Sequence, residues 1–355
     1  FPSRWEEVKD ASWAPAAAEV PPLIPEGGRC DIERVDASDL APERFKKELQ
    51  WVPGEVDAVL GFERPGSGDP SLLSRLREEL LFGTRLDQEL PGLGSAADAP
   101  SVDRVVLAAL RLRGGERAAL ALLTGRFDEN AAGSSLLPAE AALRRHLGRE
   151  MRMAPPDAAT ERVRAVAFLD GETLAYGDVG AVERSIELHK AGGEGSAPAN
   201  PALRSLLEEA EAGSHAWGLL LPAWLGFKAP GDDPALPSPG VGRSLAAIQW
   251  VTLSAKVSSG VELHISTRTQ RDDEARVLAD ALRAFLASFR LNPDAAAEVR
   301  QALQVSSVGD DDATVSLSLP LSAGALGRIR RNEASRRLLT WRLGAEERAR
   351  RERVG

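Results

Sequence analysis

Residues 106–128 read VLAALRLRGGERAALALLTGRFD, and residues 251–273 read VTLSAKVSSGVELHISTRTQRDD. Each stretch has an apolar run, a turn centred on glycine, and a second run rich in apolar or β-branched residues, which is the pattern of a β-hairpin. Each then ends in arginine and aspartate, which are common at the start of a helix. The similarity of the two stretches predicts that one structural unit occurs twice in this chain.

The segments around these hairpins extend the similarity. In the first half we expect a strand at 56–62, an amphipathic helix from Ser71, hairpins at 102–127 and 162–177, and helices in the second part of 128–151 and at 178–188. In the second half we expect a strand at 216–222, a short helix near Ser244, hairpins at 249–269 and 305–321, and helices at 272–290, at 295–303 and beyond Ser322. Both halves therefore have the order strand, helix, hairpin, helix, hairpin, helix.

Strands that are joined through hairpins pair antiparallel, unlike the crossover-linked strands of a parallel dinucleotide-binding sheet. We therefore predict an α+β fold with a tandem duplication of this unit, in which helices pack on one face of an antiparallel sheet or sheets. Composition sets the expected boundaries: a Pro- and Ala-rich N-terminal arm at 1–54, the first repeat at 55–191, a linker and helix at 192–213, the second repeat at 214–330, and a basic C-terminal tail at 331–355.

Composition and charge limit the possible functions. The net charge of −9 argues against a nucleic-acid partner, since neutralising phosphates requires a basic surface. A single cysteine, Cys30, excludes an intrachain disulfide and a metal site of several cysteines. No apolar run reaches the roughly 20 residues of a membrane helix. The sequence begins with Phe1 instead of methionine, which fits a removed signal peptide, a trimmed anchor or an arbitrary boundary.

No catalytic or metal-binding signature is present. The segment GLGSAA at 92–97 matches a dinucleotide fingerprint only superficially, because it follows a predicted helix and not a strand. The sequence has no P-loop, no nucleophile elbow and no pair of histidines at helical spacing. The aspartates at 310–312 lack the pattern of a calcium loop. We therefore expect no cofactor and no metal ion.

Acidic residues follow both hairpins. Residues 126–129, RFDE, correspond to residues 271–274, RDDE, so the candidate acids are Asp128 and Glu129 in the first copy and Asp272 and Asp273 in the second. Acids at these positions cap a helix or complement its dipole. An alternative is that the two pairs converge as the acids of an active site. That alternative requires them to lie within hydrogen-bond reach of one reacting group.

The two ends of the chain carry the candidate contacts for a partner. Trp5 and Trp13 lie in the Pro-rich arm, where they either pack back on the domain or dock on another protein. The tail has eight arginines and four glutamates, and it places Arg337, Trp341 and Arg342 close together. This composition suits a peripheral helix on an anionic membrane, a helix on an acidic protein surface, or a solvated end.

Four segments resemble uncharacterised bacterial envelope proteins in which a signal or anchor segment precedes a duplicated α+β region. They are GEVDAVLG at 54–61, LTGRFD at 123–128, AFLDGETLAYGD at 167–178 and NPALRSLL at 200–207. The resemblance covers residues 50–330. It implies an exported or membrane-tethered protein, located in the periplasm or on an envelope membrane, and it carries over no catalytic residues.

These observations favour a non-catalytic scaffold or accessory subunit of a larger, envelope- or membrane-associated bacterial assembly. One alternative is a protein that binds a small molecule or lipid in a cavity between sheet and helices, for which the abundant leucine and alanine would supply the lining. The other alternative is an enzyme built on the dispersed acids. Expected partners are other protein subunits, with possible peripheral membrane contact through the tail.

Overall fold

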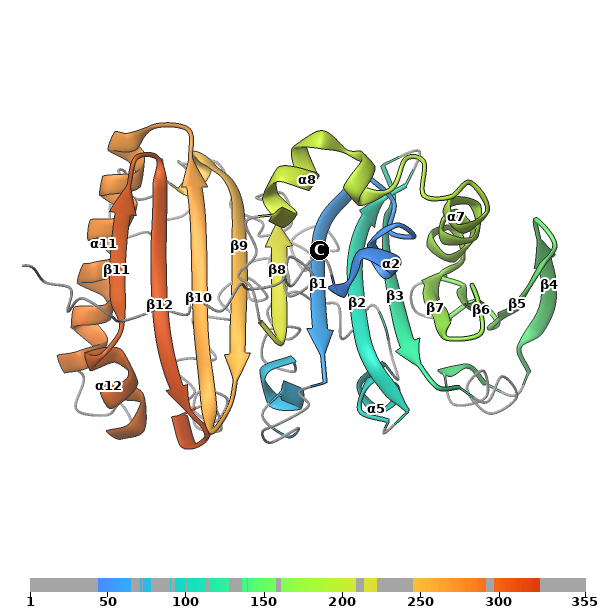
Figure 1. Cartoon of the computed structure of the whole chain (residues 1–355), viewed down its shortest axis with the longest axis horizontal. Helices are drawn as coiled ribbons and strands as arrows, with labels where there is room; N and C mark the ends of the chain where they lie inside the picture. The colour runs from blue at the N-terminus through green and yellow to red at the C-terminus, as the bar shows by residue number, and fades with distance from the viewer. Residues whose placement is uncertain are drawn as a thin grey trace, which may run out of the picture. The chain divides into compact units, whose positions relative to one another are not determined.

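The computed structural model describes residues 44–325, except for 65–70, 72, 78–89, 91–92, 100, 113–114, 128–135, 139, 158–160, 209–213, 222–244 and 292–296. The described strands form one sheet of 12 strands, and every neighbouring pair is antiparallel (Figure 1). Hairpins supply most of the connections, as the sequence predicted. The α+β class with a large antiparallel sheet is therefore confirmed.

The strands are β1 (Val56–Glu63), β2 (Val102–Arg111), β3 (Arg117–Gly125), β4 (Ala142–His146), β5 (Arg149–Met153), β6 (Arg164–Phe168), β7 (Thr173–Asp178), β8 (Ala216–Leu220), β9 (Ile248–Val257), β10 (Gly260–Thr269), β11 (Ser307–Asp311) and β12 (Thr314–Ser322). The helices are α2 (Lys46–Leu49), α5 (Leu93–Ala97), α7 (Val179–Lys190), the 3-10 turn η2 (Ala197–Ala199), α8 (Pro201–Glu208), α11 (Asp272–Leu291) and α12 (Ala297–Gln304). Across the sheet the order is β11-β12-β10-β9-β8-β1-β2-β3-β7-β6-β5-β4.

The predicted hairpins are present, but the predicted helix in the second part of 128–151 is wrong. Residues 142–153 instead form the hairpin of β4 and β5. Its turn is Leu147-Gly148, and both residues have positive φ angles, 47° and 87°. Two successive residues in this conformation make the tight turn that joins twisted strands, and a helix cannot pass through it.

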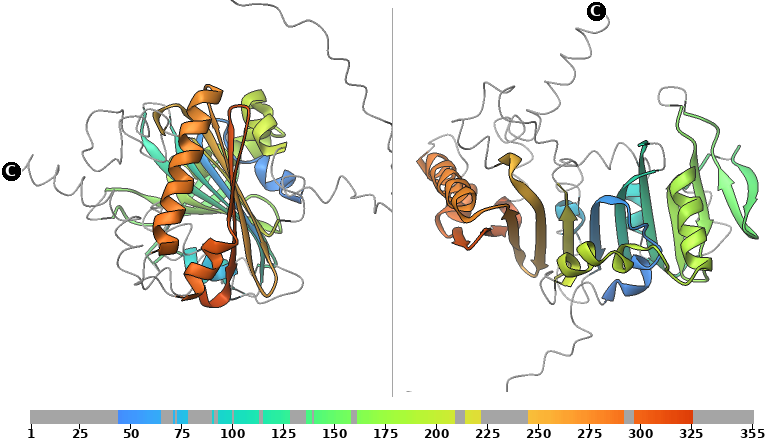
Figure 2. Two further views of the ribbon diagram at one scale, coloured as in Figure 1. Left: turned by 90° about the vertical axis from the view of Figure 1, so that its left-hand side faces the viewer. Right: turned by 90° about the horizontal axis from the view of Figure 1, so that it is seen from above.

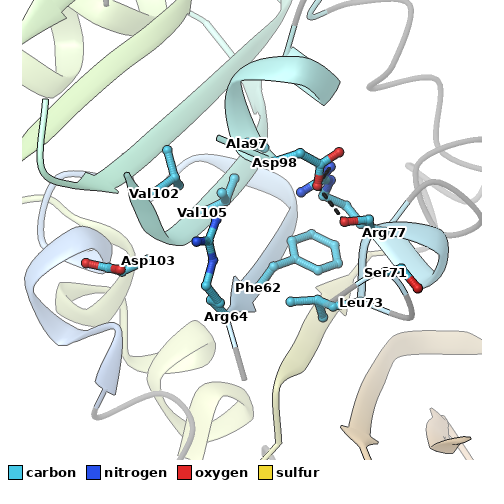
Figure 3. A pocket seen from close by; sticks show the side chains of 11 residues that line it. Phe62, Arg64, Ser71, Leu73, Arg77, Ala97, Asp98, Val102, Asp103 and Val105 are labelled. Atoms are coloured by element: carbon cyan, nitrogen blue, oxygen red, sulfur yellow. Dashed lines mark hydrogen bonds and ion pairs between the residues drawn. The ribbon is translucent and has the colours of Figure 1, made fainter. Parts of the chain in front are cut away.

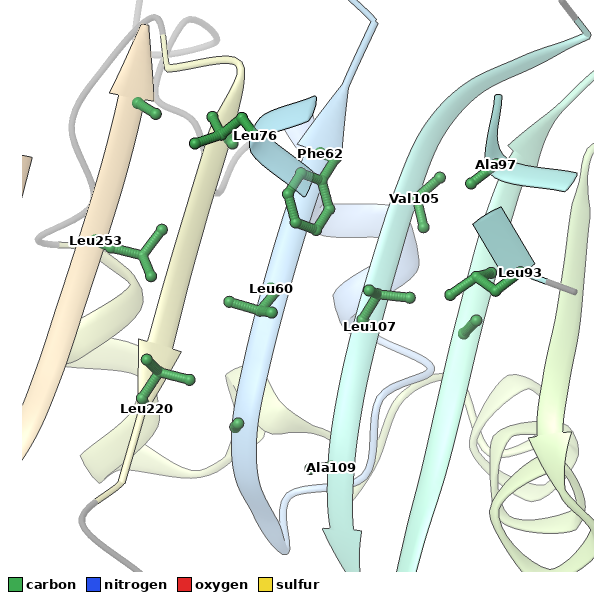
Figure 4. Packing of buried hydrophobic residues seen from close by; sticks show 14 of the residues in the cluster. Leu60, Phe62, Leu76, Leu93, Ala97, Val105, Leu107, Ala109, Leu220 and Leu253 are labelled. Atoms are coloured by element: carbon green, nitrogen blue, oxygen red, sulfur yellow. The ribbon is translucent and has the colours of Figure 1, made fainter. Parts of the chain in front are cut away.

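Helices cover both faces of the sheet, so the expectation that they pack on one face is also wrong. One apolar core contains Leu93 of α5 and Leu278 of α11, together with Leu60 and Phe62 of β1. Figure 4 shows Leu60, Phe62 and Leu93 in this core, and Figure 2 shows α11 on one side of the sheet. The opposite core contains side chains of α2, α7 and α8, packed against residues such as Val59 of β1. The reason is that β1 is buried at almost every position, so both of its faces need apolar cover.

The end of the predicted arm and the predicted linker were expected to lie outside the repeats, but both contribute to the core that contains α2, α7 and α8. Phe45 and Val52, from the end of the predicted arm, are fully buried. The glycine-rich predicted linker pairs with this segment, because Ala197 N–H donates to Val52 O at 2.8 Å and Gly54 N–H donates to Gly195 O at 3.0 Å. Gly195 has a φ of 81°, which glycine adopts easily. The glycines therefore shape an ordered turn beneath the sheet.

Asp178 joins three strands at the start of α7. Its carboxylate accepts the backbone N–H of Ala119 in β3 at 2.8 Å and forms a close ion pair with Arg164 in β6. It makes no side-chain cap to the helix that follows it. The residue therefore anchors α7 to the sheet through tertiary contacts, which a local capping pattern does not reveal.

The two halves of the sheet meet where β1 pairs with β8, through two complementary contacts. Gly61 lies opposite Trp217, and Gly218 lies opposite Leu60. A Cβ on Gly61 would stand 2.3 Å from Trp217 Nε1, and a Cβ on Gly218 would stand 2.4 Å from Leu60 Cδ2. Trp217 is only 1% exposed and contacts Phe45 edge to face, with ring centroids 5.5 Å apart. Each glycine thus makes room for a large side chain on its neighbouring strand.

We expect Gly61→Ala to lower the free energy of unfolding by about 1–3 kcal/mol, because the methyl group would overpack a buried indole that has no room to move. The matched control is Gly94→Ala in α5, where no described atom outside the helix lies within 4 Å of the added Cβ. That change should alter the free energy by under about 1 kcal/mol, and in the stabilising direction. Denaturant unfolding of both variants measures the difference, and equal effects would contradict the packing at this seam.

His215 lies beside the seam, and its Nδ1 accepts the backbone N–H of Val257 at 3.1 Å. Burial lowers the pKa of His215 below its usual value, with Arg44 adding to the shift and Glu63 opposing it. Below a pH of about 6.5 the unfolded chain therefore binds the proton before the folded chain does, so stability falls as the pH decreases towards the folded pKa.

We expect His215→Asn to lose less stability than the wild type between about pH 7 and pH 5. The asparagine amide oxygen can accept the Val257 N–H but does not titrate. Urea unfolding at several pH values measures this, and equal losses in the two proteins would contradict the role of His215.

Candidate functional site

Most of the residues predicted as a functional site lie outside the described part of the chain. These are Trp5, Trp13, Arg337, Trp341 and Arg342, together with Asp128 and Glu129.

Asp272 and Asp273 are described, and they stand in the first turn of α11. Arg271 pairs with Asp273 at 3.2 Å and with Glu274 at 2.8 Å. Acidic residues in a first turn complement the helix dipole, so these acids have a structural role at the helix end. The alternative that these acids meet Asp128 and Glu129 in one active site stays a prediction, because Asp128 and Glu129 lie outside the described residues.

A small pocket lies at one end of β1 and β2, beneath the helical residues 73–77 (Figure 3). Phe62, Leu73 and Val105 supply apolar lining, and Arg64 and Arg77 supply positive charge. Arg77 is only 4% exposed, and its Nη2 lies 2.7 Å from Asp98 Oδ1. The sequence offered no signal for this site, because its residues come from separate segments that only the fold brings together.

The geometry of the pocket argues against a role as a ligand site. Its volume is about 140 Å³. Pockets for drug-sized ligands usually measure about 300–1,000 Å³. The charges are also satisfied within the protein: Asp98 binds Arg77 and accepts from Ser74 Oγ at 2.5 Å, and Arg64 Nη2 donates to Ala99 O at 2.5 Å. The ion pair therefore serves to fix the helical residues 73–77 against the sheet.

His264 and Ser318 form the one described contact that resembles a nucleophile and its base. The histidine Nδ1 lies 3.0 Å from the serine Oγ, across β10 and β12. Such a pair needs a third group to orient the base and free N–H donors for an oxyanion. Among the described residues no carboxylate binds His264, and both strands lie inside the sheet, where their N–H groups pair with neighbouring strands. Among the described residues, the contact therefore lacks the orienting group and the free N–H donors that nucleophilic catalysis needs.

The described residues contain no cluster of three or more histidine, cysteine or acidic side chains that could hold a metal ion. In the same part of the chain, every helix is too short or too polar to span a bilayer.

A polar surface covers β10 and β12 on the face that carries Trp217. Cross-strand rows place His264 beside Ser318 and Ser266 beside Ser316, and all four side chains are half-buried. Over the first half of the chain this same face is covered by α2, α7 and α8. Helix α11 packs on β10 and β12 in the opposite core, and on the face that carries Trp217 no described helix lies over these two strands (Figure 1). The polar residues at alternate positions of β10 and β12 are Glu262, His264, Ser266, Arg268, Thr314, Ser316 and Ser318. We name these seven residues the open face.

Comparison with known proteins adds only distant likenesses in structure. No family model matches the chain, and no curated protein matches it. It is similar to the structure of crystal form I of TP0453, with a TM-score of 0.44 and 11% identity over 79% of this chain and 95% of that one. Crystal form III of TP0453 gives a TM-score of 0.46 and 11% identity over 79% and 96%. Similarity at this level assigns no function to the chain.

The structural role of the pocket predicts a stability effect. We expect Asp98→Ala to lower the free energy of unfolding by about 1–3 kcal/mol, because Arg77 would stay buried without the carboxylate that pairs with it. The control is Glu150→Ala, which breaks the exposed pair with Arg145 at 2.9 Å and should cost under about 1 kcal/mol. Denaturant titrations compare the two variants, and equal costs would contradict this role.

Proposed function

We propose that this protein is a non-catalytic scaffold or accessory subunit of a larger, envelope-associated bacterial assembly. The observation that carries the proposal is the open face, a polar surface on the interior strands β10 and β12 that no described helix covers. Its serine, threonine, histidine, arginine and glutamate side chains offer both donors and acceptors of hydrogen bonds. A partner subunit is the kind of ligand that a broad surface of this type can bind.

The size of the open face limits how a partner can bind. Ten residues at a rise of about 3.4 Å make a strand about 34 Å long, and two strands about 4.8 Å apart are about 10 Å wide. The product is about 340 Å², whereas each partner in a stable complex buries about 800 Å². A partner must therefore also contact other parts of the chain, for which Trp5, Trp13, Arg337, Trp341 and Arg342 remain the candidates from the sequence.

We also propose that the scaffold arose by tandem duplication, with repeats at 55–191 and 214–330. The strand orders support this, since β1-β2-β3-β7-β6 in the first half corresponds to β8-β9-β10-β12-β11 in the second. Under this correspondence the two copies meet through their first strands. In chain order, the hairpin of β4 and β5 lies between β3 and β6, and α11 lies between the corresponding strands β10 and β11. The two copies therefore differ at this point, which indicates that divergence followed the duplication.

The location in the periplasm or on an envelope membrane is a proposal that rests on the resemblance in sequence. Peripheral membrane contact through the tail is proposed on the same terms, from the arginines and Trp341 at 331–355. A nucleic-acid partner is disfavoured by the net charge of −9.

The proposal is tested by placing a photo-crosslinking amino acid at Ser266 and irradiating the source cells before gentle extraction. We expect a discrete adduct with another protein and migration of the chain with a large complex, because Ser266 lies within the open face. The matched control is the same amino acid at Arg276, an exposed position on α11, which should give no such adduct. Migration of the chain alone, with no adduct at Ser266, would contradict the scaffold function.

A further inference from the structure

The sheet of described strands has two edges, formed by β11 and β4. An edge strand presents unpaired N–H and C=O groups, and natural proteins usually cover or protect such groups. Here both edge strands have five residues and belong to hairpins with two residues between the strands. The two edges can therefore be compared group by group.

The β11 edge is closed from within the molecule. In its pairing with β12, alternate residues of β11 turn their backbone groups outward. Arg283 of α11 donates to the carbonyl of one of these residues, Val308, at 3.2 Å. The same guanidinium forms a close ion pair with Asp310, two residues further along β11. One arginine thus occupies the edge and neutralises its acidic side chain.

The β4 edge has no such cover among the described residues. The residues that flank a two-residue turn form a hydrogen-bonded pair, so His146 bonds with Arg149, and Arg144 with Met151. The intervening residues Leu143 and Arg145 must then turn their N–H and C=O groups away from β5. No described backbone or side-chain group bonds these outward groups. The outward N–H and C=O groups of β4 are spaced as antiparallel pairing requires, so an extended chain beside β4 would form main-chain hydrogen bonds with them.

One face of the hairpin is anchored and the other is left exposed. Arg144 pairs with Glu183 of α7 at 3.1 Å, and His146 Nε2 lies 3.4 Å from Glu187. These contacts hold β4 in place beside α7. On the opposite face Leu143 is 62% exposed, and Leu147 in the turn is 50% exposed. The exposed leucines offer apolar contacts to alternate side chains of an added strand.

Charge indicates which strand would bind there. Residues 142–153 contain four arginines and one glutamate, a net charge of +3 in a chain whose net charge is −9. Antiparallel pairing of β4 with β4 of a second copy would bring arginines together, and like charges on paired strands are destabilising. An acidic strand would instead find complementary charge.

We propose that β4 binds an extended acidic segment of a partner protein, which adds to the sheet as a further strand. This inference deepens the proposed scaffold function and rests on it for the identity of the natural partner. Main-chain hydrogen bonds would supply affinity, while Arg145, Arg152 and the exposed leucines would select acidic and apolar side chains at alternate positions.

The test uses the whole protein and a short synthetic peptide of alternating glutamate and valine, with binding measured by calorimetry. We expect Leu143→Pro to weaken binding about tenfold or more, because proline removes the outward N–H. The β4–β5 ladder does not use that N–H, and edge strands tolerate proline on their open side. The matched control, Leu143→Thr, keeps the N–H and loses only the apolar contact of the side chain, so it should weaken binding clearly less than Leu143→Pro. Thermal unfolding checks that both variants stay folded.

A second arm tests charge. Arg145→Glu with Arg152→Glu should abolish binding of the glutamate peptide and create binding of a lysine–valine peptide. Equal binding of both peptides by the wild type, or unchanged binding by Leu143→Pro, would overturn the inference. Binding of phosphatidylserine vesicles without binding of the peptide would also overturn it, in favour of a membrane contact.

The two proposals fail in distinguishable ways. If the chain migrates alone and gives no crosslinked partner, the scaffold function fails even when the peptide binds β4. If the complex forms equally well with wild type and with Leu143→Pro, and the peptide does not bind, only the inference about the β4 edge fails.

Discussion

The contact between β1 and β8 is the constraint on which the rest of the structure depends. Two glycines, Gly61 and Gly218, each face a large side chain on the neighbouring strand, so the strands approach closely while Trp217 and Leu60 fill opposite cores. Because this pair joins the two halves into one sheet, each core is continuous across them. A side chain larger than hydrogen at either position would separate the halves or displace a buried residue.

Charged groups then set where the covering segments lie. Glu48 of α2 is fully buried and pairs with Arg104 of β2 at 2.9 Å, and Asp178 ties α7 to β3 and β6. Buried ion pairs contribute little net stability compared with apolar packing, although breaking one is costly. Their effect here is to position each segment on a sheet whose apolar surface alone would accept several arrangements. Arg283 does the same at the β11 edge.

Local signals predicted the strands and hairpins well, and failed where the signal was ambiguous. Asp170-Gly171 and Ser258-Ser-Gly260 mark turns between alternating residues, and both hairpins are present. The turn at Leu147-Gly148 gave no clear signal, because only four of the ten residues in the flanking strands are apolar and they do not alternate regularly. This pattern does not distinguish a strand from a helix. The pocket around Arg77 and the contact of His264 with Ser318 join residues far apart in the chain, so no local pattern could reveal them.

By itself the sequence determined the α+β class, the antiparallel pairing through hairpins, and the places of the long helices α7 and α11, because periodicity and turn residues act over short distances. Only the tertiary structure decided that one sheet contains all the described strands, that helices cover both faces, and that the glycines near 193–195 form an ordered turn. It also decided that Arg283 of α11 closes the β11 edge, while none of the described residues covers the β4 edge. These features depend on burial and on contacts between distant segments, whose free energy is not encoded in any short stretch of residues.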